Sequence, residues 1–418
     1  MSEDVLMPDF QEIIAAETSS ERSGPAAWSR TVTSRNFASL RPLGRVRRIG
    51  PQPAGQEAGR PAASNPVASN PVALNPVDWG GTVGAIPDEY VVFENVFVTR
   101  MGAVVEGNDF FMEDMLFRKK DSGDLGPEWM QRYLRDYGAT PTADGTEISS
   151  HKPPVKKSGT YFLLTHGHTR NFGHFVHDVL PRFHIFDHLP EELRRGATLL
   201  AGHHPLPMQQ ALLEAFRGDH PIATISPGLV WQIERVVMPR NPMSSVAVSV
   251  PALRHARERM QRIAGSDRPP ASRRPVYIAR PNPPAPDPRR LDNLPALEAL
   301  LDEYGFVRMH CETLSPREQM ELFRGTSVLI GLHGAGMMNQ LFLPGDATVI
   351  EITARPRKPR PRRPNGMPMS PSWIITLSQL LGLGGYYSIP EWRDEEAHVD
   401  IATLRDFLDY LREEGKLG

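Results

Sequence analysis

The segment from Val328 to Asn339 constrains the fold of this chain more than any other. It reads VLIGLHGAGMMN: a short apolar run, then a histidine, then two glycines that flank an alanine, then residues that favour a helix. An apolar run of this length, closed by glycines, is typical of a buried parallel strand that ends in a tight loop. Backbone N–H groups at such a strand–loop–helix corner bind anions, most often phosphates. The segment therefore predicts an α/β unit with a nucleotide-type ligand at this corner.

Apolar runs and helical patterns alternate on both sides of that segment. We expect strands at 276–279, 306–309, 328–332 and 348–352, with helices at 294–304 and from Ser315 onward. Ser315 begins the letters SPRE, in which a hydroxyl, a proline and a glutamate are spaced as a helix start. Strands separated by helices predict a parallel, doubly wound sheet, and ligands bind such sheets beyond the carboxyl ends of the strands. Three polar side chains at strand ends should therefore gather at one edge: Arg280, His333 and Glu351.

The preceding part of the chain shows a second, less regular α/β pattern. Strands are expected at 90–93, 95–99, 161–164, 197–200 and 235–238, and helices at 173–187 and 207–216. Pro181 falls inside the first of these helices, so we expect a kink or an early stop there.

The two ends of the chain differ from its centre. Residues 1–85 are rich in Ala, Ser, Pro, Gly and Arg and repeat Asn-Pro-Val three times, so we expect a disordered or extended tail, with a docking segment as the alternative. We divide the rest into an N-terminal α/β domain at 86–265, a second α/β domain at 266–395 and an amphipathic helix at 396–418. The basic, proline-rich run 355–363 is interpreted as a solvated loop, and contact with an anionic membrane or an acidic glycan is the weaker alternative.

Composition and charge exclude several classes of protein. A net charge of −2 over 418 residues argues against a nucleic-acid partner, and a single cysteine excludes a disulfide framework or a cysteine zinc cluster. The chain contains no apolar run of the roughly 18–20 residues that a membrane helix needs, and its acidic start lacks the order of a secretory signal. The expectation is a soluble cytoplasmic protein with at most peripheral membrane contact, and its oligomeric state is left open.

The letters NFGHFVHDVLPR, from Asn171 to Arg182, carry the first candidate site. On a helix, His174, His177 and Asp178 lie on one face. A histidine beside a carboxylate suits proton abstraction near neutral pH, so these residues are candidates for a catalytic base or an acceptor contact. Two other interpretations stay open: a buried polar cluster that only joins helix to loop, and a metal site, although no second set of ligands is evident.

A second candidate site combines arginines with the glycine-bearing corner. Guanidinium groups beyond a strand end match the oxygens of a diphosphate, although a solvated loop would explain the same arginines. The corner could equally be an ordinary strand-to-helix turn. Glu351 lies within an expected strand, where a ribose hydroxyl or a loop amide could satisfy its carboxylate. The candidates for this site are Arg280, Arg289, Arg290, Asn293, His333, Gly334, Ala335, Gly336, Asn339 and Glu351.

Taken together, these residues resemble glycosyltransferase family 61. The matching segments are NFGHFVHDVLPR, VYIAR (276–280), RRLDN (289–293), SPREQMELF (315–323) and LIGLHGAGMMNQLFLPGDATVIEI (329–352), in the order found in the family. The resemblance implies a GT-B architecture, with two Rossmann-like domains facing across a cleft. It also implies inverting transfer of a hexosyl or pentosyl group from a nucleotide sugar, usually UDP-linked, to a glycan or other hydroxyl acceptor, with no essential metal or other cofactor.

The same resemblance implies roles for the candidate residues. Arg280 with Arg289 or Arg290 would neutralise the diphosphate, and the 334–336 loop would cradle it. His333 and Asn339 would lie at the same site, while Asp178 or His177 would remove the acceptor proton. The chain lacks the anchor and cysteines of secretory-pathway members, so a bacterial-type enzyme of surface polysaccharide synthesis is expected. The run 355–363 also departs from the family's pattern, which puts the rim of the donor site in doubt.

Two other functions are kept as alternatives. A metal-dependent phosphohydrolase would use His174, His177 and Asp178 as ligands and would need bound divalent metal. A non-catalytic nucleotide- or glycan-binding protein would keep the fold without turnover.

Overall fold

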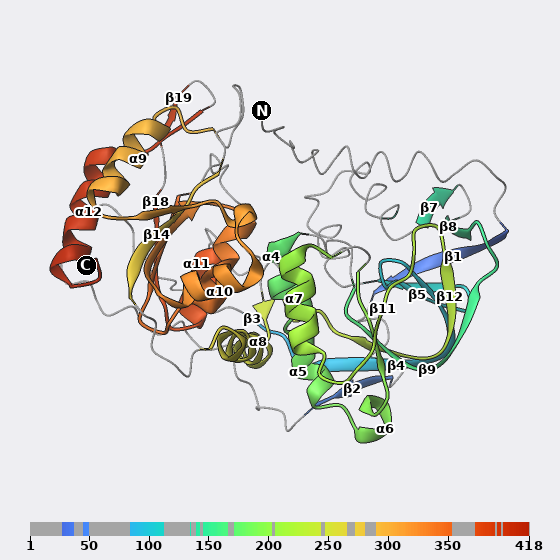
Figure 1. Ribbon diagram of the computed structural model, residues 1–418. Coiled ribbons are helices and arrows are strands. Elements are labelled where there is room, and N and C mark those ends of the chain that lie inside the picture. The colour runs from blue at the N-terminus through green and yellow to red at the C-terminus, as the bar shows by residue number, and fades with distance from the viewer. Residues whose placement is uncertain are drawn as a thin grey trace, which may run out of the picture.

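The computed structural model describes residues 27–36, 45–49, 84–112, 134, 139–142, 145–165, 171–202, 205–243, 247–265, 272–280, 290–352, 373–388, 391–393 and 396–417. Within these residues the chain forms a mixed α/β structure with two large sheets (Figure 1). Two short strand pairs accompany them: β3 (Gly84–Ala85) with β13 (Ala247–Val248), and β19 (Glu391–Arg393) with β20 (Glu396–His398). The Asn-Pro-Val repeat and the basic run 355–363 lie outside the described residues.

The C-terminal sheet is wholly parallel and doubly wound, as the sequence predicts. Its spatial order is β15 (Val307–Met309), β14 (Arg274–Ile278), β16 (Thr326–Leu332), β17 (Thr348–Ile352) and β18 (Gly384–Ser388). Counted along the chain this order is 2-1-3-4-5, in which the winding reverses between the first and third strands. The crevice beyond the carboxyl ends of β14 and β16 is therefore where this fold binds ligands.

Helices cover both faces of the C-terminal sheet because its strands carry apolar residues on both faces. On one face, Val276, Leu329 and Val349 pack in a core that also contains residues of α10 (Pro316–Arg324), α11 (Trp373–Leu380) and the 3₁₀ helix η4 (Ala335–Phe342). On the other face, Tyr277, Ile330 and Ile350 pack with α9 (Leu294–Glu303) and α12 (Ile401–Glu413). Strands buried on both faces explain why the sequence reads as continuous apolar runs.

The N-terminal sheet joins a parallel part to an antiparallel part. β11 (Ile222–Ala223), β10 (Thr198–Leu200), β9 (Val155–Leu163) and β12 (Val230–Pro239) are parallel and follow the order 3-2-1-4. β4 (Glu89–Thr99) then runs antiparallel to β12. The sheet continues through β5 (Val104–Glu106), β6 (Asp109–Met112), β1 (Trp28–Asn36), β8 (Gly145–Ser150) and β7 (Ala139–Thr142). The winding of the parallel part reverses between β9 and β12, which marks a second crevice of the same kind.

Two expectations about the N-terminal region need correction. The sequence predicts that residues 1–85 form a disordered or extended tail, with a docking segment as the alternative. Disorder is wrong for β1 and for β2 (Val46–Arg48), which pair with β8 and β4 respectively. The two strands expected at 90–93 and 95–99 are one strand, β4. Asn95 interrupts its pattern with φ of 53°, a left-handed conformation that asparagine tolerates better than most residues.

The expected helix at 173–187 is divided into three parts. α4 (Phe172–His174) passes into a π-helical turn, η2 (Phe175–Val179), and α5 (Arg182–Asp187) follows. Leu180 donates its N–H to the Phe175 carbonyl, and Pro181, which has no N–H to donate, is the N-cap of α5. The break predicted at Pro181 is therefore present. Short π-helical turns of this kind often occur at functional sites.

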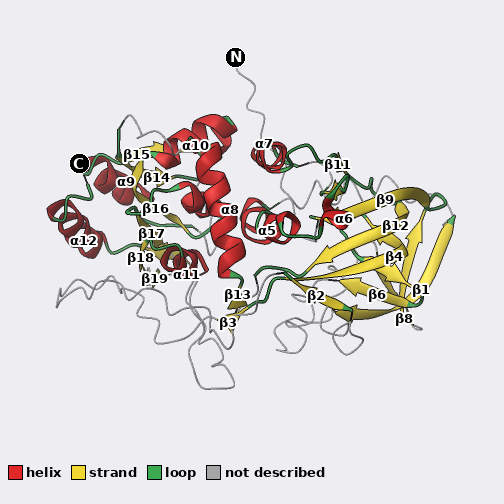
Figure 2. Ribbon diagram, turned by 90° about the horizontal axis from the view of Figure 1, so that it is seen from below, coloured by secondary structure: helices red, strands yellow, loops and turns green. Residues whose placement is uncertain are grey.

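The two sheets share a continuous hydrophobic core. α8 (Val250–Ile263) runs between them, beside α5 and α7 (Pro207–Phe216), as Figure 2 shows. One apolar cluster extends from Phe162 in β9 through Phe183 in α5 and Met260 in α8 to Leu329 in β16. Burying each such side chain contributes roughly 1.5–3 kcal/mol. The two units are thus packed against each other.

Candidate functional site

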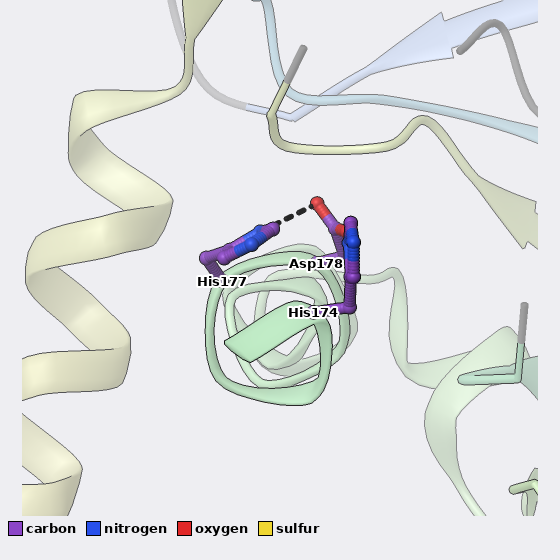
Figure 3. A group of neighbouring side chains, drawn as sticks. All are labelled: His174, His177 and Asp178. Carbon is purple, nitrogen blue, oxygen red and sulfur yellow. Dashed lines mark hydrogen bonds and ion pairs between the residues drawn. The ribbon is translucent and has the colours of Figure 1, made fainter. Parts of the chain in front are cut away.

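Three polar side chains converge on the π-helical turn that follows β9. Asp178 is 1% exposed, and its Oδ2 lies 2.8 Å from Nδ1 of His174. Nδ1 of His177 lies 2.9 Å from Oδ1 of the same carboxylate, at an ion-pair distance outside hydrogen-bond geometry. Figure 3 shows the two imidazoles on either side of the carboxylate. The sequence correctly placed the three residues together.

The chemistry of this cluster is set by burial and by its two histidines. Burial would raise the pKa of Asp178, but the charges of His177 and His174 and the hydrogen bond with His174 outweigh it and hold the pKa well below its usual range. Asp178 is therefore a carboxylate at neutral pH. The side chain of His174 is 31% exposed and that of His177 13%, so the histidines, and not the carboxylate, face outward.

Two side chains that sequence analysis did not single out support Asp178. The buried Arg182 donates from Nε to the Asp178 carbonyl at 2.9 Å and from Nη1 to the carbonyls of Leu163 and Thr165. Asn241, at the end of β12, places Nδ2 3.5 Å from Asp178 Oδ1. Arg182 belongs to the quoted motif, and Asn241 follows a strand that neighbours β9. Their positions in sequence were signals that could have identified both.

The opposite crevice carries the second group of candidates. Arg280 follows β14 and donates from Nη1 to the His333 carbonyl at 3.3 Å. Nδ1 of His333 contacts Oε1 of Glu351, which is fully buried in β17. The predicted gathering of Arg280, His333 and Glu351 at one sheet edge is confirmed. The partner of Glu351 is the His333 ring, in place of the loop amide or ribose hydroxyl that the sequence suggested.

The glycine-bearing corner is close-packed. Gly334 is extended with φ of 169°, and Ala335 begins η4, which is a 3₁₀ helix where the sequence suggested an α-helix. A Cβ on Gly336 would lie 3.3 Å from the Ile278 side chain, and one on Gly331 would lie 2.7 Å from Met337 Sδ. Close approach thus favours glycine at positions 331 and 336, whereas a Cβ on Gly334 would make only ordinary contacts, the nearest at 3.6 Å from Arg280 Nη1. Asn339 is buried and donates to the Gly336 carbonyl at 2.9 Å, so it braces the turn from inside.

The remaining candidates of the second group lie elsewhere or are not described. Arg289 falls outside the described residues. Asn293 exchanges two hydrogen bonds with the backbone of Val399, at 2.7 and 3.0 Å, which joins the start of α9 to the C-terminal segment. The carbonyl of Arg290 accepts from the N–H of Ala397 in the same segment. These contacts give Asn293 a structural role at the start of α9.

The two candidate sites meet. A Cβ on Gly173, at the start of α4, would lie 3.5 Å from both Cα and Cβ of Ala335. Segments about 160 residues apart in the chain therefore touch, and the histidine cluster adjoins the glycine-bearing corner. A reaction between groups bound at the two crevices would take place at this junction.

Within the described part of the chain, one group of potential metal ligands was found. The ligand atoms of His174, His177 and Asp178 all lie within 4.8 Å of one another. Histidine and carboxylate ligands suit Zn²⁺, and catalytic zinc sites use three such ligands with an open fourth position. No helix among the described residues is both long and apolar enough to cross a membrane.

Comparison with known proteins gives a family likeness over the middle of the chain. Residues 172–350 match the model of the family Glycosyltransferase 61, a stretch that extends from the start of α4 into β17 and includes both candidate sites. Over this stretch the chain is similar to that glycosyltransferase family.

One curated relative adds a more particular likeness. A segment of 51 residues is 41% identical to the EGF domain-specific O-linked N-acetylglucosamine transferase of Drosophila melanogaster. That segment covers 12% of this chain and 10% of the relative, so the likeness is confined to a small part of both proteins.

Proposed function

We propose that this protein is an inverting glycosyltransferase of the GT-B type that transfers a sugar from a UDP-linked donor to a hydroxyl of a glycan acceptor. The contact between Gly173 and Ala335 is the observation that carries the proposal, because it brings a proton-accepting cluster beside an anion-binding corner. We further propose that the product belongs to a surface polysaccharide, in a bacterial-type pathway.

On the donor side, Arg280 and the backbone of the 334–336 corner would bind the diphosphate. Arg280 lies beyond the carboxyl end of β14, at the crevice that nucleotides occupy in doubly wound sheets. As the bond from the anomeric carbon to the diphosphate breaks, negative charge grows on the leaving oxygen. A guanidinium group and N–H groups already in place would stabilise that charge without reorganisation.

On the acceptor side, we assign the base to His174 and an orienting role to Asp178. Asp178 is too deeply buried to reach an acceptor, and its low pKa makes it a weak base. With Nδ1 of His174 held by the carboxylate, Nε2 would take the proton as the acceptor oxygen bonds to the anomeric carbon. Attack from the face opposite the leaving diphosphate inverts that carbon. His177 would complete the cluster.

A ligand screen followed by product analysis tests the proposal. A donor that binds only the folded protein raises its melting temperature, so UDP sugars should do so more than uridine. Incubation of the stabilising donor with acceptor glycans should then yield a product whose anomeric configuration, read by NMR, is opposite to that of the donor. Retention of configuration, or stabilisation by no nucleotide sugar, would contradict the proposal.

The metal-ligand spacing of His174, His177 and Asp178 supports a second candidate, a metal-dependent phosphohydrolase. Metal analysis of the purified protein, with a phosphatase assay before and after chelation, separates the two functions. Chelator-sensitive phosphate release would favour the hydrolase, whereas sugar transfer that survives chelation would favour the transferase. Nucleotide-sugar binding with neither activity would indicate a non-catalytic binding protein.

A further inference from the structure

Glu351 is a charged residue in a position that otherwise takes apolar side chains. β17 is buried along its whole length, and the neighbours of Glu351 are Ile350 and Ile352, both fully buried. Gly331 lies opposite Glu351 in the adjacent strand. Burying an ionised carboxylate is costly unless it is paired. A residue that served packing alone would be apolar here.

One polar contact of the Glu351 carboxylate is described. Oε1 contacts Nδ1 of His333, and Oε2 has no hydrogen-bond partner among the described residues. The backbone N–H of His333 donates to the Ile352 carbonyl at 2.8 Å, so the histidine is tied to β17 by both its main chain and its ring. Because the buried Glu351 carboxylate holds Nδ1, the orientation of the His333 ring is fixed.

The outer edge of the His333 ring faces the proposed donor site. The side chain is 53% exposed although Glu351 beneath it is fully buried. Arg280, which contacts the His333 carbonyl, lies beside it. Both follow the two strands between which the winding of the sheet reverses. The arrangement resembles a metal-bound histidine whose second ring nitrogen is held by a carboxylate, which sets the tautomer and orientation of the ring.

We propose that Glu351 is a positioning residue for donor binding: it holds the Nδ1–H of His333 so that Nε2 is presented to the nucleotide sugar. The inference rests on the proposed function and assigns Glu351 a role through His333, without direct contact with the donor. The affinity for the donor then depends on a hydrogen-bond-accepting oxygen on the side chain of residue 351, but only while His333 is present.

Titration calorimetry with UDP on the full-length protein tests this dependence. Glu351→Leu should weaken UDP binding about tenfold, by analogy with the carboxylates that support metal-bound histidines. Glu351→Gln, which keeps an oxygen for Nδ1–H, should retain most of the affinity. In a His333→Ala background, Glu351→Leu should cause no further loss. Glu89→Gln is the matched control for burial, because Glu89 is also fully buried but pairs with Arg48 and Arg240 in the other sheet.

An equal loss of affinity from Glu351→Leu with and without the histidine would overturn the inference, as would no loss in either background.

Imidazole ¹⁵N NMR gives a readout that needs no nucleotide. The wild-type spectrum should show a hydrogen-bonded Nδ1 proton on His333 that persists in Glu351→Gln and disappears in Glu351→Leu. If Glu351→Leu does not fold, the other two variants still test the pairing. The Nδ1 proton signal should be lost in His333→Ala and kept in Glu351→Gln. Absence of this signal from the wild-type spectrum would contradict the pairing. If the wild type binds no UDP, the proposed function fails while the NMR result still decides the pairing.

Discussion

At the scale of single residues, the proposed site depends on two buried carboxylates that contact histidines. Asp178 and Glu351 are both almost inaccessible, and each contacts a histidine that is more exposed than itself. The carboxylate orients the imidazole, and the imidazole offsets part of the cost of burying the carboxylate. The two pairs lie in the two crevices that meet at Gly173 and Ala335.

Removal of the Asp178 charge should therefore affect turnover far more than donor binding. We expect Asp178→Asn to lower the rate of sugar transfer by about two to four orders of magnitude, the usual size of a general-base effect. The Kd for UDP should change little. Asp187→Asn, which alters a half-buried carboxylate paired with His255 and Arg259, is the control and should keep its activity. Near-normal rates in both Asp178→Asn and His174→Ala would show that the base assignment is wrong.

Arg280 should behave in the opposite way, because its proposed partner is the diphosphate. Arg280→Ala should weaken UDP binding by about 2 kcal/mol, the typical contribution of a hydrogen bond to a charged group. Uridine, which has no phosphate, should bind both proteins alike. Arg308→Ala, which removes an arginine paired with Glu298 and Asp302, serves as the control in the same calorimetric titration. Equal losses for UDP and uridine would contradict the assignment.

The lowered pKa of Asp178 also predicts a pH dependence of stability. The group binds protons less readily in the folded than in the unfolded protein, so its contribution to stability is present above the ordinary pKa of 3.8 and is lost as pH falls toward the lower folded value. Urea midpoints of wild type and Asp178→Asn should thus differ most at neutral pH and converge below about pH 4. A difference that stays constant down to pH 2 would rule out this linkage.

At the scale of elements, local sequence signals decide where helices begin. Ser315 and Glu318 form a capping box at the start of α10, with the Ser315 Oγ accepting from the Glu318 N–H and the carboxylate accepting from the Ser315 N–H. α10 packs behind η4 and supports the glycine-bearing corner without contacting the proposed donor.

Loss of this cap should reduce stability while leaving donor binding intact. Ser315→Ala should lower the free energy of unfolding by about 1 kcal/mol, measured by urea denaturation. Ser149→Ala, in the exposed part of β8 where no helix begins, should change it little. A change in the Kd for UDP larger than the change in stability would mean that α10 has a more direct role at the donor site.

At the scale of the whole molecule, one buried arginine ties the two sheets together. Arg257 in α8 donates to the carbonyls of Leu343 and Leu381, which belong to segments around the C-terminal sheet. Burial lowers the pKa of Arg257, and the two carbonyls take the place of an acidic partner. The shared apolar cluster and this arginine make the packing of α8 the main link between the two units.

Replacement of Arg257 should weaken that link. Arg257→Met keeps much of the volume but removes the donor to the Leu381 carbonyl, while Gln261 still donates to the Leu343 carbonyl. We therefore expect a loss of about 1–3 kcal/mol and a urea transition that separates into two phases. Arg254→Met, on the exposed face of the same helix, should unfold like the wild type. A single transition with unchanged midpoint in Arg257→Met would show that the apolar core alone holds the units together.

The sequence by itself determined most of the elements and part of the membership of the two candidate sites. The doubly wound sheet, the break at Pro181, the Ser315 helix start and the grouping of His174 with Asp178 all follow from periodicity, capping and local spacing, which act over a few residues. What depends on contacts between distant segments could be decided only by the tertiary structure. It docked β1 onto the sheet in place of a disordered tail, paired Glu351 with His333, used Asn293 and Asn339 as internal braces, and brought Gly173 against Ala335. Each of these contacts joins segments that are distant in the sequence. Local sequence patterns cannot predict such contacts, because the contacts form only when the chain packs.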